Sequence, residues 1–328
     1  MGSTVSRSDF EWKYDEEPHS TRRREIMKKY PHVRKLFGVD PWFKWHVALL
    51  VFLQVGACLL IRSYPSISWL SIAIGAYWFG GVINLSMMLA IHDIAHNTAF
   101  GQRRFFANRL FGIFANLPII VPFASSFKRY HIEHHRYLGI ERVDPDLPTR
   151  MEARFFTSTT RKVLWLICQP LLYPIRPLCV RSKRLTHLEY ANMVIQFIFN
   201  FWVLLFCGVK AFTYMFAGSL VSMGIHPMAG HFISEHFVFE DIGGGDTFSY
   251  YGPMNPITFN VGYHMEHHDL PYVAGRHLPA LKDLAPEYYD TLPQHRSWTK
   301  VLWDFVFDPS SGPYARVKRP TREDAHHT

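Results

Sequence analysis

The sequence predicts an all-α integral membrane protein, with four transmembrane helices in two hairpins, interfacial helices, and a cytosolic helical cap that carries a metal site. Two observations lead to this prediction. Long apolar runs without charged residues alternate with polar, basic segments along the 328 residues. Three clusters among the 19 histidines lie in the segments that follow apolar runs. Uncharged apolar runs of about 17 to 25 residues are long enough to cross a bilayer as helices.

The first predicted hairpin consists of residues 45–61 and residues 67–91. The first run has no charge between Lys44 and Arg62, and the second has none at all. Basic residues, including the triplet at positions 22–24, precede the first run. Because cytosolic segments are enriched in lysine and arginine, we expect the N-terminus in the cytosol and His92 at the cytosolic end of the second span.

Residues 190–208 and 211–225 form the second predicted hairpin, with only Val209 and Lys210 between them. Two other apolar stretches, residues 105–124 and 163–180, are interrupted by prolines and charged residues. We expect them to be re-entrant or to lie along the membrane surface. Four spans return the chain to the cytosol before residue 264, so all three histidine clusters would face the same side.

The three clusters have helical spacing. The first is H-x3-H, and the pattern H-x2-H-H occurs twice, at residues 131–135 and 264–268. Positions i, i+3 and i+4 share one face of a helix, so each cluster can direct its imidazoles to one point. A satisfied polar core or a solvated face is the alternative, but chance explains two copies poorly. The predicted metal ligands are His92, His96, His131, His134, His135, His264, His267 and His268.

The number and type of these ligands indicate the metal. Eight imidazoles exceed what one zinc ion takes, and the protease motif H-E-x-x-H is absent. Magnesium and calcium prefer oxygen ligands. Two first-row transition ions fit the ligand count, and iron is the expected metal for oxygen chemistry at a membrane surface. The predicted cap therefore carries a di-iron site.

Charge and cysteine content narrow the classes of partner. The net charge is +8, but the basic residues are spread over several segments without a nucleic-acid-binding module, so an anionic membrane surface is the simpler partner. The four cysteines lie in apolar runs without C-x-x-C spacing and are expected to be small hydrophobic residues. They are Cys58, Cys168, Cys179 and Cys207.

Three regions follow from these patterns. Residues 1–44 are predicted to be a cytosolic segment whose opening, M-G-S-T-V-S, matches a myristoylation pattern at Gly2; an unmodified start is the alternative. Residues 45–280 form the membrane domain with the histidine clusters. Residues 281–328 are expected to form short cytosolic helices and a loose basic tail around Arg316, Lys318 and Arg319.

The histidine clusters resemble the three boxes of membrane desaturases and hydroxylases. More narrowly, S-D-F-E-W at residues 8–12, S-F-K-R-Y at 126–130, G-H-F at 230–232, Y-Y-G-P at 250–253 and F-N-V-G-Y at 259–263 resemble the sphingolipid Δ4-desaturases. The resemblance implies a multi-pass enzyme of the endoplasmic reticulum that converts dihydroceramide to ceramide with O2. It also implies electrons from cytochrome b5 and NAD(P)H through a separate reductase. Some relatives are also C4-hydroxylases, and the sequence leaves the ratio of the two activities open.

The resemblance assigns the eight box histidines as iron ligands and implies a ninth ligand between the last span and the third box. His231 is the candidate for that ligand, with Glu235 and His236 close behind; a polar cluster at a helix end is the alternative. Asn260 and Tyr263 are candidates for contacts to the ligands or the substrate. Three carboxylates within the boxes either orient imidazoles or face water: Asp93, Glu133 and Glu266. Two carboxylates after the second box either bind a polar headgroup or lie in a solvated loop: Asp144 and Asp146.

Two other functions remain open at this stage. One is an acyl-lipid desaturase or hydroxylase that acts on a different lipid. The other is a membrane metal-binding or scaffolding protein without catalysis. The presence of iron and a lipid product at C4 would separate the three.

Overall fold

The computed structural model describes residues 10–321, which form an almost entirely helical chain; Gly2, Ser8 and Asp9 lie outside this range. The first seven α-helices are α1 (Pro18–Lys29), α2 (Phe43–Ser63), α3 (Trp69–Gly75), α4 (Gly81–Ala95), α5 (Phe105–Asn116), α6 (Ala124–Arg136) and α7 (Arg150–Phe155). The others are α8 (Thr159–Arg181), α9 (His187–Trp202), α10 (Val209–Met223), α11 (Gly230–Ser234), α12 (His264–Asp269), α13 (Leu278–Leu284) and α14 (Trp298–Phe307). The four short strands are β1 (Glu11–Trp12), β2 (Ser249–Tyr250), β3 (Gln294–His295) and β4 (Val317–Lys318).

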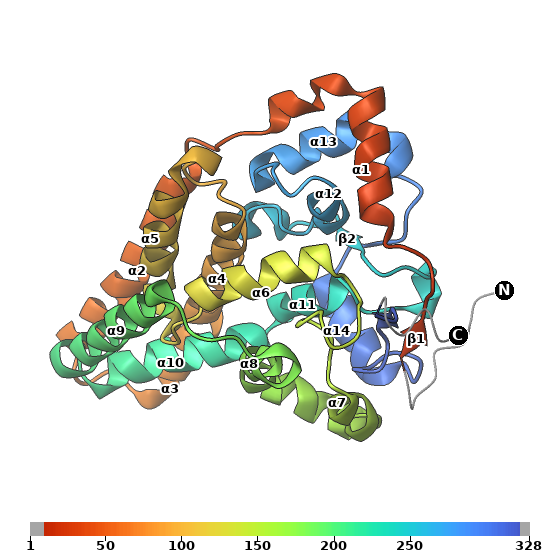
Figure 1. Ribbon diagram of the computed structural model, residues 1–328. Coiled ribbons are helices and arrows are strands. Elements are labelled where there is room, and N and C mark those ends of the chain that lie inside the picture. The colour runs from red at the N-terminus through yellow and green to blue at the C-terminus, as the bar shows by residue number, and fades with distance from the viewer. Residues whose placement is uncertain (1–9, 322–328) are drawn as a thin grey trace.

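The helices form three groups around α6 (Figure 1). Helices α2, α3, α4, α5, α9 and α10 gather at the left of the view. Helices α1, α12 and α13 lie together at the upper right, and α7, α8 and α14 lie at the lower right. Because α6 crosses the centre, its histidines lie where the apolar helices meet the other two groups.

Within residues 10–321, four helical segments are long and apolar enough to cross a membrane: α2, residues 69–95, α8, and residues 187–207. The first two and the last agree with the predicted spans. Residues 69–95 form α3 and α4 joined by one π-helical turn, Ala76–Gly80, and residues 187–207 end in a second such turn. Residues 102–119 and 124–136 form a pair bent by 112°, as a re-entrant or surface segment would be.

The remaining segment, α8, takes the place of the predicted fourth span, residues 211–225. Helix α10 has 15 residues, as many as the predicted span 211–225, but these make only about 22 Å of helix, which is short for a bilayer core of about 30 Å. The proline-containing helix α8, which we expected to lie in the interface, meets the length and composition of a span instead. Its exposed face carries Ile167, Leu171, Ile175 and Leu178, while Arg176 on the other face is buried.

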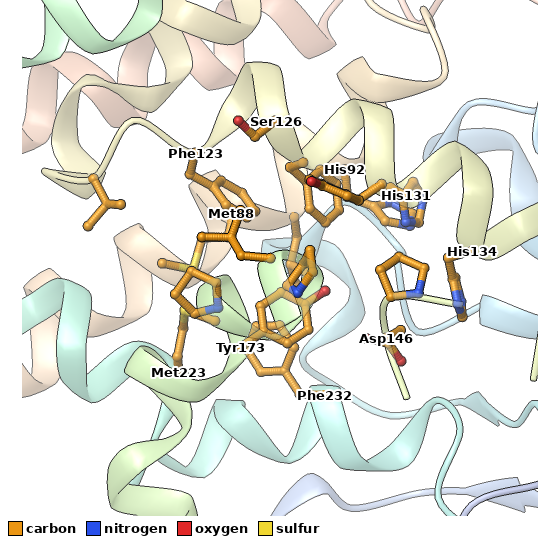
Figure 2. A pocket seen from close by; sticks show the side chains of 18 of the residues that line it. Met88, His92, Phe123, Ser126, His131, His134, Asp146, Tyr173, Met223 and Phe232 are labelled. Carbon is orange, nitrogen blue, oxygen red and sulfur yellow. The ribbon is translucent and has the colours of Figure 1, made fainter. Parts of the chain in front are cut away.

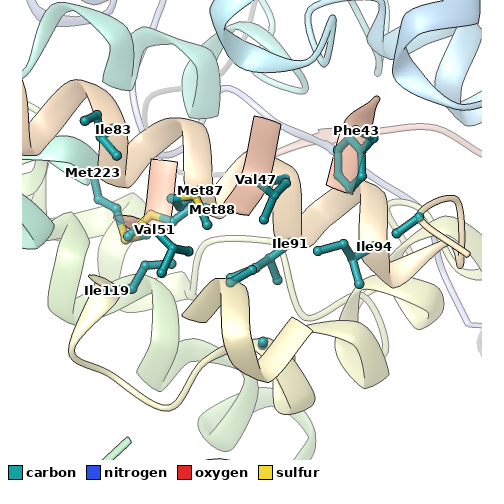
Figure 3. Packing of buried hydrophobic residues seen from close by; sticks show 14 residues of the cluster. Phe43, Val47, Val51, Ile83, Met87, Met88, Ile91, Ile94, Ile119 and Met223 are labelled. Atoms are coloured by element: carbon teal, nitrogen blue, oxygen red, sulfur yellow. The ribbon is translucent and has the colours of Figure 1, made fainter. Parts of the chain in front are cut away.

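The core beneath the histidines joins α2, α4 and α10. Phe43, Val47 and Val51 of α2 pack against the α4 residues Met87 and Ile91 (Figure 3). Deeper in the bundle, buried polar side chains pair with one another: the Gln54 amide donates to Asn84, and the Tyr214 hydroxyl donates to Gln54 at 2.6 Å. Inside a membrane, polar groups need such partners because lipid offers none.

The two ends of the described chain pair with each other. Strands β1 and β4 run parallel, with Glu11 opposite Val317. The predicted loose basic tail is therefore wrong: Arg316 and Arg319 are buried. Each has a carboxylate partner, Asp146 for Arg316 at 2.9 Å and Asp246 for Arg319 at 2.6 Å. These partners lie more than 70 residues earlier in the chain, so local composition gave no sign of them.

Candidate metal centre

Helices α4, α6 and α12 bring the three histidine boxes together. The first group comprises five histidines whose ligand atoms all lie within 4.8 Å of one another: His92, His96, His131, His135 and His267. The Nε2 atom of His131 lies 2.9 Å from that of His96 and 3.0 Å from that of His135. Each helix contributes at least one member, so the group forms only when all three boxes meet.

The second group adjoins the first and comprises His134, His236 and His268. The His236 Nε2 lies 3.0 Å from the Nε2 of His134 and 2.9 Å from the Nε2 of His264, which places His264 at the edge of this group. The two groups are neighbours, because the rings of His135 and His268 stack with centroids 4.1 Å apart. The arrangement provides two adjacent imidazole pockets.

The expected ninth ligand, His231, lies outside both groups. Its Nε2 is 2.8 Å from a carboxylate oxygen of Glu235, and the same oxygen is 3.0 Å from the Nδ1 of His264. His236, which we ranked behind His231, lies within the second group instead. The short helix α11 ends at Ser234, so the i+5 residue His236 does not follow the helical spacing from His231 and lies in a different group of side chains.

Burial favours the neutral form of most of these imidazoles; His134 is the exception, because despite its burial the neighbouring Asp144 carboxylate raises its pKa. Burial lowers the pKa of His236, His267 and His268 well below the ordinary value for imidazole. A neutral imidazole has one lone pair to give to a metal. The buried His268 Nε2 has no hydrogen-bond partner among the described residues, and neither ring nitrogen of His92 has one.

Buried nitrogen atoms without partners are costly unless something binds them. Five converging imidazoles also cannot all pair as donor and acceptor, because each neutral ring carries a single N–H. The donor set contains only nitrogen, which suits first-row transition metals and not magnesium or calcium. The residues present thus fit two transition-metal ions.

The carboxylates inside the boxes do not contact the imidazoles. Asp93 accepts a hydrogen bond from the backbone of Gly275, and Glu266 accepts from the hydroxyls of Ser249 and Tyr251. Glu133 pairs with Lys183 at 2.6 Å. The two buried carboxylates, Asp93 and Glu266, therefore neither orient an imidazole nor face water.

Carboxylates outside the boxes orient the histidines instead. Asp144 lies 2.9 Å from the Nδ1 of His134, and Glu235 lies 3.0 Å from the Nδ1 of His264. A bond from Nδ1 fixes the ring and leaves Nε2 for a ligand. The expectation that Asp144 lies in a solvated loop is wrong, because it is fully buried.

Asn260 and Tyr263 support the third box from the preceding loop. The Asn260 amide donates to the carbonyl of Gly275 at 3.2 Å, and Asn260 has a positive φ of 59°. The Tyr263 ring packs against Tyr251. Neither residue lines the large cavity beside the histidines, so their contacts are to the loops around α12.

That cavity has a volume of about 360 Å³ and reaches both imidazole groups. His92, His131 and His134 lie at its inner wall (Figure 2). Met88, Phe123 and Met223 line the opposite end, and Tyr173 and Phe232 lie between (Figure 2). Its walls are mostly apolar, as expected for a site that holds an aliphatic chain.

Comparison with known proteins agrees with this geometry. The family described as Fatty acid desaturase matches residues 67–300, and the family described as Sphingolipid Delta4-desaturase matches residues 6–42. The chain is 53% identical to the sphingolipid delta(4)-desaturase/C4-monooxygenase of Mus musculus over 319 residues, 97% of each chain.

Two further relatives extend the comparison. The sphingolipid delta(4)-desaturase of Drosophila melanogaster is 53% identical over 322 residues, which cover 98% of this chain and 99% of that one. The corresponding delta(4)-desaturase of Homo sapiens is 51% identical over 319 residues, 97% of each chain. One family match covers the N-terminal segment, the other covers the range that contains the three histidine boxes, and the relatives match almost the whole chain. The chain therefore belongs to the sphingolipid Δ4-desaturase family of fatty acid desaturases.

Proposed function

We propose that this protein is an O2-dependent sphingolipid Δ4-desaturase that inserts a trans C4–C5 double bond into dihydroceramide to give ceramide. The observation that supports this most directly is the apolar cavity that ends at two adjacent groups of buried imidazoles. The relatives with this name match the chain from end to end. Because the mouse relative also carries the name C4-monooxygenase, C4-hydroxylation is a second activity of the same proposed site.

In this proposal two iron ions occupy the two groups. His92, His96, His131, His135 and His267 hold one ion, and His134, His236, His264 and His268 hold the other. His236 thus takes the ninth position in place of His231. Bound iron would supply the oxidation of an unactivated C–H bond with O2.

The overall reaction balances without further reagents. Two hydrogen atoms leave adjacent carbons, and with O2, two electrons and two protons they form two waters. Hydroxylation instead places one oxygen atom at C4 and forms one water from the same electrons and protons. The protein's part is to hold the chain along the apolar wall and exclude bulk water from the imidazoles.

We further propose cytochrome b5 as the electron donor, supplied from NAD(P)H by a separate reductase, and the endoplasmic reticulum membrane as the location, with termini and site in the cytosol. His135 is only partly buried, whereas every other histidine of the two groups is buried. The exposed Arg136 follows it directly. A positive charge at the accessible edge suits an acidic donor protein.

The proposal is tested in a host that lacks the activity. The protein is expressed with labelled dihydroceramide, lipids are analysed by mass spectrometry, and iron is measured on the purified protein. The expected result is Δ4 or C4-hydroxy product and about two iron ions per chain. A product from another lipid would assign a different substrate, and His267→Ala with unchanged product would overturn the metal site.

A further inference from the structure

The cavity beside the histidines has two chemically different ends. Sulfur and aromatic side chains form one end, where Met88, Met223 and Phe123 lie (Figure 2). At the other end, on the far side of the inner histidines, the carboxylate of Asp146 lies close to His134 (Figure 2). A lipid with an aliphatic chain and a hydrogen-bonding headgroup therefore fits the cavity in one orientation.

Asp146 is fixed relative to the metal-binding histidines. Its backbone N–H donates to Asp144 at 2.9 Å, and the same Asp144 oxygen lies 2.9 Å from the Nδ1 of His134. The Arg316 guanidinium donates to the Asp146 carboxylate at 2.9 Å, and Arg176 donates to its carbonyl at 3.2 Å. Both arginines are buried, while the Asp146 side chain keeps 21% of its surface exposed. One carboxylate is thus held at the cavity wall with room for an incoming donor.

The other charged groups that line the cavity are positioned differently. Lys183 pairs with Glu133 at 2.6 Å. Glu189 pairs with Arg129 at 2.5 Å and accepts from Ser126 at 2.9 Å. Neither Lys183 nor Glu189 is tied to a box histidine by these contacts, whereas Glu235, which also lines the cavity, contacts His264 directly at 3.0 Å. Among the carboxylates that line the cavity in the described chain, only Asp146 is linked to a box histidine indirectly, through Asp144. Asp146 itself contacts no imidazole.

We propose that Asp146 determines specificity by binding the polar headgroup of the substrate. Its neighbour in the subsite is Tyr173, which lines the same cavity and whose ring centroid lies 5.7 Å from the Arg176 guanidinium that donates to the Asp146 carbonyl. This inference rests on the proposed function. In dihydroceramide the reacting carbons are next to C3, which carries a hydroxyl, and the amide N–H and the C1 hydroxyl are one and two carbons further on. A headgroup that leaves water must replace its hydrogen bonds, and a carboxylate accepts from several donors at once. Hydrogen bonds from the headgroup donors to Asp146 position C4 of the substrate beside the imidazoles.

The test compares two substrates in two variants. Dihydroceramide is compared with its 1-deoxy analogue, which lacks the C1 hydroxyl, using purified protein, electron donors and lipid vesicles. A site built to bond a hydroxyl discriminates strongly against the analogue that lacks it, and we expect the wild type to prefer dihydroceramide by about tenfold or more in kcat/KM. Asp146→Asn is expected to lower kcat/KM for dihydroceramide about tenfold or more and to reduce that preference. Tyr173→Phe removes one oxygen without disturbing an ion pair and is expected to raise KM for dihydroceramide.

Asp246→Asn is the matched control, because Asp246 also pairs with an arginine of the C-terminal segment, Arg319, but does not line the cavity. It is expected to leave the preference between the two lipids unchanged. If Asp146→Asn keeps the wild-type preference, or loses turnover of both lipids equally, the headgroup subsite is wrong. If Asp146→Asn does not fold, Tyr173→Phe decides: an unchanged KM overturns the subsite.

Failure of the proposed function gives a different result, since the wild type would then form no C4 product from either lipid. The preference of the protein for one of the two lipids can still be measured in that case. Thermal shift of the purified protein with each lipid compares their binding without turnover. Equal shifts with the two lipids would overturn the subsite.

Discussion

The second and third histidine boxes have the same spacing but different supports. The second lies in α6, a helix of 13 residues that packs against α4, α5 and α9. The third lies in α12, a helix of six residues. Short helices do not persist on their own, because each pays the cost of nucleation for few hydrogen bonds. An identical motif therefore needs different partners in the two places.

Helix α1 supplies much of the support for the third box. Arg23 donates to the carbonyls of Asp269 at 2.5 Å and His268 at 3.1 Å, at the C-terminal end of α12. Arg22 and His19 both contact the Asp269 carboxylate, at 2.6 and 2.7 Å. Charged donors at a helix C-terminus satisfy its last carbonyls and interact favourably with its dipole. The helix of the second box is also held by distant residues, but at side chains along its length and not at its C-terminal carbonyls: Lys183 pairs with Glu133, and Glu189 pairs with Arg129.

The largest effect is expected at the residue that joins the two boxes, His236. His236→Ala removes a nitrogen placed between His134 and His264, so iron should fall from about two ions per chain to about one, and turnover by a factor of about a hundred or more. Iron analysis and product formation measure both. His231→Gln is the comparison, since His231 lies outside both groups. Retained iron in His236→Ala, with loss in His231→Gln, would restore His231 as the ninth ligand.

The clamp on α12 gives the next effect. Arg23→Gln removes a charged donor from the end of α12 and is expected to weaken iron binding about tenfold to a hundredfold. Competition with a chelator measures the affinity. Arg24→Gln is the matched control, because exposed Arg24 contacts only Thr21 within its own helix. Equal affinities in the two variants would mean that α12 holds its histidines without α1.

The glutamates inside the two boxes sharpen the same contrast. Glu266 is fully buried and accepts from two hydroxyls, whereas Glu133 pairs with Lys183 near the surface. Glu266→Gln leaves buried groups imperfectly paired and is expected to destabilise the protein by about 1 to 3 kcal/mol. Glu133→Gln should cost at most about 1 kcal/mol. Thermal unfolding of the iron-free proteins compares them, and equal losses would contradict the difference in support.

The smallest effect concerns the sheet beside the third box. His295 in β3 pairs in register with Tyr250 in β2, next to Ser249, which donates to Glu266. Burial lowers the pKa of His295 to about 4. The unfolded chain therefore binds its proton first, and stability is lost as the pH falls from about 6.5 towards 4. In His295→Gln, the melting temperature should depend less on pH across that range than in wild type. If the dependence on pH is the same in both, His295 is not the residue responsible for the loss of stability.

Patterns within short stretches of sequence predicted those helices whose position depends on their own residues. Apolar runs predicted α2 and the α3–α4 segment. Helical spacing predicted that the imidazoles of each H-x2-H-H box meet at one point, but this was wrong: His131 and His135 lie in one group and His134 in the other. The predicted span at α10 was wrong because 15 residues are short for a bilayer, and the prolines misled at α8, which stays helical through three of them. A helix tolerates proline where the carbonyl groups that lose their N–H donors find other hydrogen-bond partners.

The missed features depend on contacts between distant segments. Asp144 orients His134 from ten residues away, and Asp269 meets His19 from 250 residues away. Nothing in the neighbourhood of Arg316 distinguishes a buried, paired guanidinium from a solvated one. The same holds for His236, because nothing in the local sequence shows that it lies within an imidazole group and that His231 lies outside.

The pairing of β1 with β4 sets an order for making the protein. The Arg316 guanidinium that anchors Asp146 and the Arg319 guanidinium that anchors Asp246 belong to a segment that the ribosome synthesises near the end of the described chain. Until residues 316–319 have emerged, neither carboxylate has its partner, and the first strand has nothing to pair with. The finished enclosure around the imidazoles is thus a late event in biosynthesis, after the apolar helices have already been inserted.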